Sequence, residues 1–109
     1  MDIKTSDQRA TPRFSVQCRT MLSGSKKLEG TGVLLDLAVG GCRIESPVAV
    51  EPGLSLELRI YVPDFGGPLL IEEANVQWVK DQIFGLAFFR ITDTEQQRLG
   101  QAIRDLMEG

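Results

Sequence analysis

The chain turns a corner at Asp36-Leu37-Ala38-Val39-Gly40-Gly41, between two runs typical of β-strands, residues 32–35 and 42–45. A carboxylate, a small residue and two glycines meet at this corner. Glycine lets the backbone approach another group closely and adopt a positive φ. The corner therefore either only turns the chain or places an acceptor and backbone N–H groups against a polar ligand. The rest of the sequence has to decide between the two.

The sequence around this corner predicts six short strands. The clearest covers residues 54–62, where Leu54, Leu56, Leu58, Ile60 and Val62 alternate with more polar positions. Such alternation indicates a strand with one buried face. Similar patterns predict strands at about 14–22, 28–37, 42–46, 70–80 and 83–89, separated by turn residues at 23–25 and 63–68. Six strands at this spacing favour an antiparallel barrel or sandwich.

The period of the pattern changes near the C-terminus. One stripe of a helix is formed by Leu99, Ala102, Ile103, Leu106 and Met107. Thr92 and Glu95 have the spacing of a capping box at its start. We therefore expect a mainly β domain with one helix lying across it. The expected organisation is an N-terminal arm, residues 1–13, followed by a single domain, residues 14–109.

Composition excludes several classes of function. The chain has no histidine and no Cys-x-x-Cys, which disfavours a zinc site or a histidine general base. No phosphate-binding P-loop or activated nucleophile is recognisable, so we predict a protein that is not an enzyme and has no cofactor. Cys18 and Cys42 are expected to be buried reduced thiols. With a polar N-terminus and no apolar run of about 20 residues, we expect a cytoplasmic protein without membrane insertion.

Charge is distributed unevenly along the chain. The net charge is −3, yet residues 1–30 carry six basic and three acidic side chains. The overall acidity argues against a nucleic-acid polymer as partner, because such binding depends on many cationic contacts. The basic N-terminal part leaves room for a small anion.

Three charged residues could together bind a nucleotide. Arg9 and Arg13 flank Pro12 in the expected arm. A guanidinium binds phosphate oxygens or the O6 and N7 of guanine bidentately and stacks on bases. Asp36 offers a carboxylate that can accept from the N–H donors on the Watson–Crick edge of guanine. Alternatively, both arginines are solvated charges on a flexible arm and Asp36 only caps a turn.

The two motifs together resemble the PilZ domain, a bacterial receptor module for the second messenger cyclic di-GMP. That family carries R-x-x-x-R in an N-terminal arm, which Arg9 to Arg13 match, and D/N-x-S-x-x-G between two early strands. The stretch Asp36–Gly41 matches the second motif, except that Ala38 replaces the family's serine. The stretch from Trp78 to Phe88 and the final helix extend the resemblance over nearly the whole chain.

The resemblance implies a six-stranded antiparallel β-barrel with a C-terminal helix. By carry-over, the residues that bind cyclic di-GMP are Arg9, Arg13, Asp36, Ala38 and Gly41. The signal would pass to an unidentified downstream protein when the ligand orders the arm. Alternatively, since Ala38 lacks the hydroxyl, the domain has weakened or lost nucleotide binding and acts as an adaptor in an assembly such as a pilus.

Three further side chains receive expectations from the pattern alone. Trp78 is expected in the core, because it shares strand parity with Ala74 and Val76. Arg43 has the opposite parity to its neighbours, so it either reaches the ligand or faces solvent, and we favour solvent. Phe65, in a glycine-rich loop, either contacts a partner or folds back onto the domain.

Overall fold

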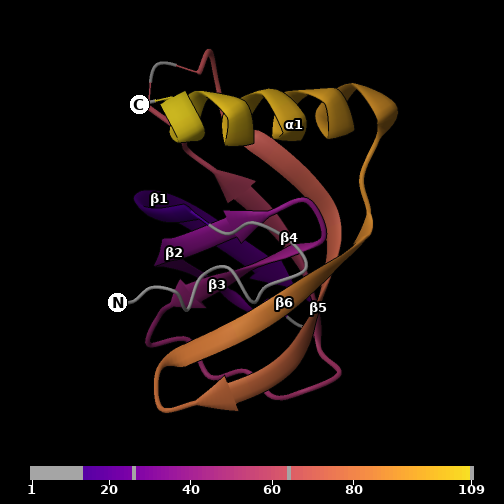
Figure 1. Ribbon diagram of the computed structural model, residues 1–109. Helices are drawn as coiled ribbons and strands as arrows, with labels where there is room; N and C mark the ends of the chain where they lie inside the picture. Colours follow the sequence, from indigo (N-terminus) through magenta and orange to yellow (C-terminus); the bar gives the residue numbers. More distant parts are fainter. Residues whose placement is uncertain (1–13, 26, 64, 109) are drawn as a thin grey trace.

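The alternating segments form six strands and the periodic C-terminal segment forms a helix, as predicted. The computed structural model describes residues 14–25, 27–63 and 65–108. The elements, labelled in Figure 1, are β1 (Phe14–Gly24), β2 (Glu29–Ala38), β3 (Gly41–Glu45), β4 (Ser55–Ile60), β5 (Leu69–Lys80), β6 (Ile83–Arg90) and α1 (Asp93–Glu108). The expected arm, including Arg9 and Arg13, lies outside the described residues.

The six strands close into a barrel in the order β1-β2-β3-β6-β5-β4, and β4 pairs again with β1. All of these pairings are antiparallel. The prediction of a barrel is thereby confirmed over the alternative of a sandwich. Closure gives each of these strands two neighbours, so the barrel offers no long unpaired strand to another chain.

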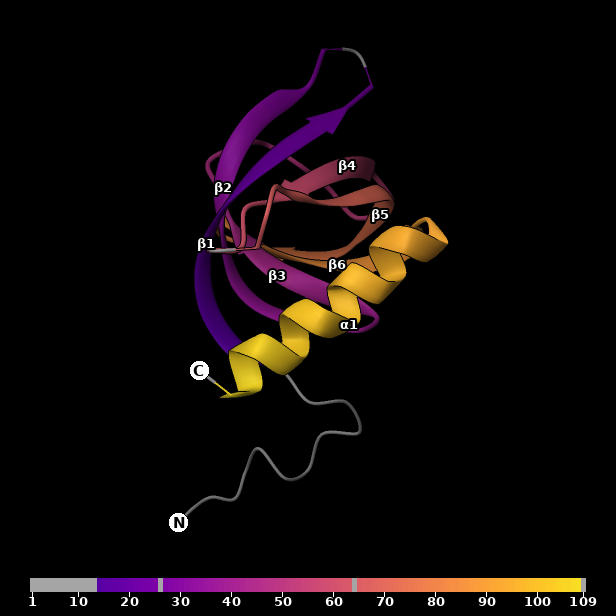
Figure 2. The ribbon, with the colours of Figure 1, turned by 90° about the horizontal axis from the view of Figure 1, so that it is seen from above.

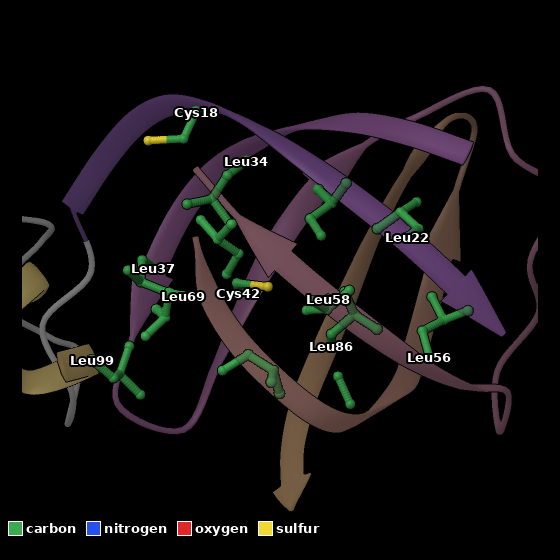
Figure 3. Packing of buried hydrophobic residues seen from close by; sticks show 14 of the residues in the cluster. Cys18, Leu22, Leu34, Leu37, Cys42, Leu56, Leu58, Leu69, Leu86 and Leu99 are labelled. Carbon is green, nitrogen blue, oxygen red and sulfur yellow. The ribbon is translucent and has the colours of Figure 1, made fainter. Parts of the chain in front are cut away.

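Inward-facing side chains from all six strands fill the barrel. Figure 3 shows several of them, including Leu34, Leu58 and Leu86, converging on one interior. Cys18 and Cys42 belong to this core as buried, reduced thiols, as predicted. Burial raises the pKa of the Cys18 thiol, because the thiolate would lose hydration there.

Register shifts interrupt the strand pairing at several places, and two of them change the direction of side chains that matter for function. The pairing of β2 with β3 shifts between Leu34 and Asp36, and that of β5 with β6 shifts between Val76 and Trp78. An extra residue reverses the side on which later side chains emerge. The prediction that Trp78 is a core residue is therefore wrong, and its side chain lies on the outer face with 42% exposure.

The helix α1 lies across one end of the barrel (Figure 1). Viewed onto this end, the β1–β2 hairpin extends away from α1 (Figure 2). Leu99, Ala102 and Ile103 are buried, as their stripe predicted, whereas the side chains of Leu106 and Met107 lie outside the description. Figure 3 shows Leu99 beside Leu37 and Leu69 of the barrel. The helix thus closes an opening that would otherwise expose the core.

The capping box is only half formed. The Thr92 hydroxyl accepts from the backbone N–H of Glu95, 3.2 Å away. The Glu95 carboxylate instead accepts from the backbone N–H of Leu70 at 3.0 Å and from Arg98 at 2.9 Å. The first turn of α1 is therefore bonded to the start of β5 as well as to itself.

Arg98 fixes the loop that precedes β5. Its terminal nitrogens donate to the carbonyl oxygens of Phe65, Gly67 and Pro68 at 2.9–3.4 Å. Its guanidinium also lies 4.8 Å from the ring centre of Phe65, which packs against the core. Of the two alternatives for Phe65, the structure shows the one in which it folds back onto the domain.

We expect Arg98→Ala to lower the free energy of unfolding by about 1–3 kcal/mol, because it removes the donor to three loop carbonyls and one of the two donors to the Glu95 carboxylate. Arg104→Ala is the matched control, since Arg104 on the same helix is exposed and, among the described residues, donates to Gln101 alone. Urea unfolding followed by circular dichroism measures both. Equal stability of the two variants would contradict this role of Arg98.

Candidate functional site

The bulge in β2 turns Asp36 to the outer face of the barrel. Leu34 and Leu37 are both fully buried although they are three residues apart, so the two residues between them are directed away from the core. Asp36 is opposite Arg43 of β3. The Arg43 Nε donates to Asp36 Oδ2 at 2.6 Å, and the Asp36 side chain is 6% exposed. A charge-assisted bond of this length fixes the orientation of the carboxylate.

A row of directly opposed residues continues from this ion pair. Arg43 is opposite Gly85 of β6, and Gly85 is opposite Trp78 of β5. Directly opposed residues of antiparallel strands share one face of the sheet. The outer face therefore carries, on four adjacent strands, a carboxylate, a guanidinium, a position without side chain, and an indole.

Gly85 creates the space into which Trp78 folds. A methyl group at position 85 would overlap the indole Nε1 and Cε2 of Trp78. The indole consequently lies over the strand next to Arg43 and presents a partly exposed aromatic surface. Such a surface can stack on a planar ring.

A pocket of about 250 Å³ opens beside this row. Its lining includes Ala38, Gly41, Arg43, Trp78 and Ala87. The volume is below the roughly 300–1,000 Å³ of pockets that enclose a whole drug-sized ligand. The pocket therefore suits one part of a larger ligand, such as a single base or phosphate.

Gly41 is required by the packing of β3 against β6. It is buried, and a methyl group there would overlap the carbonyl oxygen of Leu86. Gly40, its neighbour in the turn, has nothing within 4 Å of the corresponding position. The two glycines of the corner thus have different roles, which the sequence did not distinguish.

The structure brings together three of the residues predicted for the site. Asp36, Ala38 and Gly41 all lie at the end of the β2–β3 hairpin, and Ala38 and Gly41 are directly paired. Arg9 and Arg13 lie outside the described residues. Sequence reasoning missed Trp78 and the ion pair of Arg43. The pairs Leu34/Leu37 and Val76/Val79, apolar residues three apart within a strand, were the available signal for both bulges.

A family model described as the PilZ domain matches residues 7–105 of the sequence. The chain belongs to the PilZ domain family. The matched region includes both the Arg9–Arg13 motif and the Asp36–Gly41 corner. A comparison with the curated proteins gives no match.

Solved structures with the same fold include several PilZ proteins. The Bacillus subtilis inhibitor of motility (MotI/DgrA) has a TM-score of 0.73 and 20% identity, covering 99% of this chain and 57% of its own. The PilZ domain with c-di-GMP of YcgR from Escherichia coli has a TM-score of 0.77 and 14% identity, and the match covers 93% of this chain and 92% of the YcgR chain. The K. pneumonia MrkH–c-di-GMP complex has a TM-score of 0.76 and 15% identity, and the match covers 93% of this chain and 53% of the MrkH chain. At these identities the similarity shows the fold alone, and the chain spans little more than half of MotI/DgrA and MrkH.

The described part of the PilZ domain shows neither a metal-binding cluster nor a membrane-spanning helix. Within the described ranges, no group of three or more His, Cys, Asp or Glu could hold a metal ion. The helix of the described part is not long and apolar enough to cross a membrane. The outer face of β2, β3, β6 and β5 is the candidate site because it carries the row of opposed residues and the pocket.

We expect Gly41→Ala to lower the free energy of unfolding by about 1–3 kcal/mol, because the added methyl group forces β3 away from the backbone of β6. Gly40→Ala, one residue away in open space, should change it by less than about 0.5 kcal/mol. Urea denaturation of both variants tests this difference. If the two variants are equally stable, the close approach at Gly41 is not a packing constraint.

Proposed function

We propose that this PilZ domain is a receptor for cyclic di-GMP. The observation that carries the proposal is the outer-face row, in which the Asp36 carboxylate and the Trp78 indole flank Arg43 beside a pocket. The YcgR and MrkH structures named above contain c-di-GMP, which supports this ligand for a domain of the same family. The role requires no catalytic group.

Each part of the row matches a part of a guanine nucleotide. A carboxylate such as Asp36 accepts from guanine N–H donors. The indole of Trp78 offers a stacking surface, and base–aromatic stacking contributes about 1–3 kcal/mol per base. The proposed roles of Arg9 and Arg13 are contacts to guanine and phosphate, for which the guanidinium geometry is suited.

The proposed relay follows from where the arm joins the barrel. β1 begins at Phe14, which pairs with Leu37, while the next residue, Ser15, pairs with Asp36. The start of β1, to which residues 1–13 connect, therefore lies beside the Asp36–Gly41 corner. A ligand that binds both the corner and the arm favours one arrangement of the arm, and this changes the surface offered to a downstream protein.

Ala38 favours a second candidate, an adaptor with weakened or lost nucleotide binding. Ala38 lines the pocket and is 3% exposed, without the hydroxyl of the family motif. Capture of the same partner proteins with and without cyclic di-GMP would distinguish the two, because an adaptor of this kind binds them equally in both conditions.

Titration calorimetry with cyclic di-GMP tests the receptor directly. We expect heat of binding for the wild-type chain and none for Arg13→Ala, since that change removes a guanidinium group that is proposed to contact the ligand. The melting temperature of Arg13→Ala should match that of the wild type. A folded wild-type chain that releases no heat at high-micromolar ligand would exclude the receptor function. Unfolding of Arg13→Ala would instead make Arg13 a structural residue.

Ala38→Ser should bind cyclic di-GMP about tenfold more tightly, because one regained hydrogen bond contributes about 0.5–1.5 kcal/mol. Ala87→Ser is the matched control, since Ala87 lines the same pocket from β6, and it should bring no gain. Calorimetry compares the three proteins. Unchanged or weaker binding by Ala38→Ser would show that the hydroxyl has no partner in this site.

A further inference from the structure

Arg43 is only partly engaged by the protein. Its Nε donates to Asp36 at 2.6 Å. Across the described part of the chain, neither of its terminal nitrogens makes a hydrogen bond or an ion pair. Its side chain is 43% exposed and lines the pocket beside Trp78. Arg43 thus presents free N–H donors at the mouth of the proposed site.

Arg98 and Arg59 differ from Arg43 in this respect. The terminal nitrogens of Arg98 are occupied by loop carbonyls and Glu95. Arg59 contacts Glu57 through a terminal nitrogen, at 3.5 Å. Arg43 is held through Nε, which restrains the guanidinium plane and leaves the outer edge unoccupied. A planar guanidinium can bind one acid along each edge, which an ammonium group cannot do.

We propose that Arg43 is a phosphate-binding residue of the nucleotide site, with its terminal N–H groups donating to a phosphate of the ligand. This inference rests on the proposed function. The Asp36 carboxylate by itself would repel a dianionic ligand, and Arg43 neutralises it through one edge. The edge formed by the terminal nitrogens then binds phosphate, because hydrogen bonds between a guanidinium and a phosphate are charge-assisted and therefore strong. Strand parity predicted that Arg43 faces away from the core, and its side chain does lie on the outer face.

Calorimetric titration with cyclic di-GMP tests the assignment on Arg43→Ala and Arg43→Lys. We expect Arg43→Ala to weaken binding about 10- to 100-fold, the range for loss of hydrogen bonds to a charged group. Arg43→Lys should also bind more weakly than the wild type, because one ammonium cannot hold both acids. Arg59→Ala, an exposed arginine outside the pocket lining, should bind as the wild type does.

A double-mutant cycle separates phosphate binding from mere positioning of Asp36. If Arg43 acted only by positioning the Asp36 carboxylate, Arg43→Ala would not change the binding affinity of a protein that already carries Asp36→Asn. We expect Arg43→Ala to weaken binding in this background too. Should Arg43→Ala fail to fold, Arg43→Gln, which keeps an amide donor for Asp36, replaces it in the cycle.

The outcomes are distinct from those for the receptor itself. Binding by the wild type together with equal binding by Arg43→Ala would overturn this assignment alone. A loss that disappears in the Asp36→Asn background would also overturn it, leaving Arg43 as a positioning residue. No binding by the wild-type chain would overturn both the receptor function and the role of Arg43.

Discussion

The extra residue in β2 is the constraint on which the site depends. In a strand of strict period two, Asp36 would face the same side as Leu34 and enter the core of the barrel. A buried carboxylate without a partner is costly, by several kcal/mol even after relaxation. The bulge keeps Leu34 and Leu37 in the core and places Asp36 outside, opposite Arg43. The matching irregularity of β1 between Ser15 and Cys18 lets the neighbouring strand follow.

A bulge in β5 likewise turns an aromatic side chain from the core to the outer face. The bulge keeps Val76 buried and opposite Leu86, and turns Trp78 outward onto Gly85. The candidate site is therefore built from two backbone irregularities and from positions without side chains. The strands that carry it are held by ladders on both sides, whereas α1 is bonded to the loop before β5 through Arg98. A disturbance of that loop can alter stability without touching the residues of the site.

The sequence was sufficient to predict the strands and the helix because most buried positions follow one period. Leu56, Leu58 and Ile60 alternate strictly, and Leu99, Ala102 and Ile103 follow the helical spacing. Parity arguments failed where a bulge intervenes, as at Trp78. The corner of the site was recognisable from Asp36 to Gly41 as a local motif. The contribution of β5 and β6 was not, because Trp78 and Gly85 meet Arg43 only through strand pairing.

The charge of the site has to be argued locally, since the chain as a whole carries −3. The charges of Asp36 and Arg43 cancel, but they are not equally accessible. The carboxylate is buried, whereas the guanidinium is partly exposed and lines the pocket. A dianionic ligand approaching the outer face therefore meets cationic N–H groups before it meets the carboxylate. Within the proposed function, attraction to phosphate depends on a few arginines and not on a general positive field. If the proposal holds, each such group contributes a large share of the affinity, and the hydroxyl absent at Ala38 is expected to weaken binding.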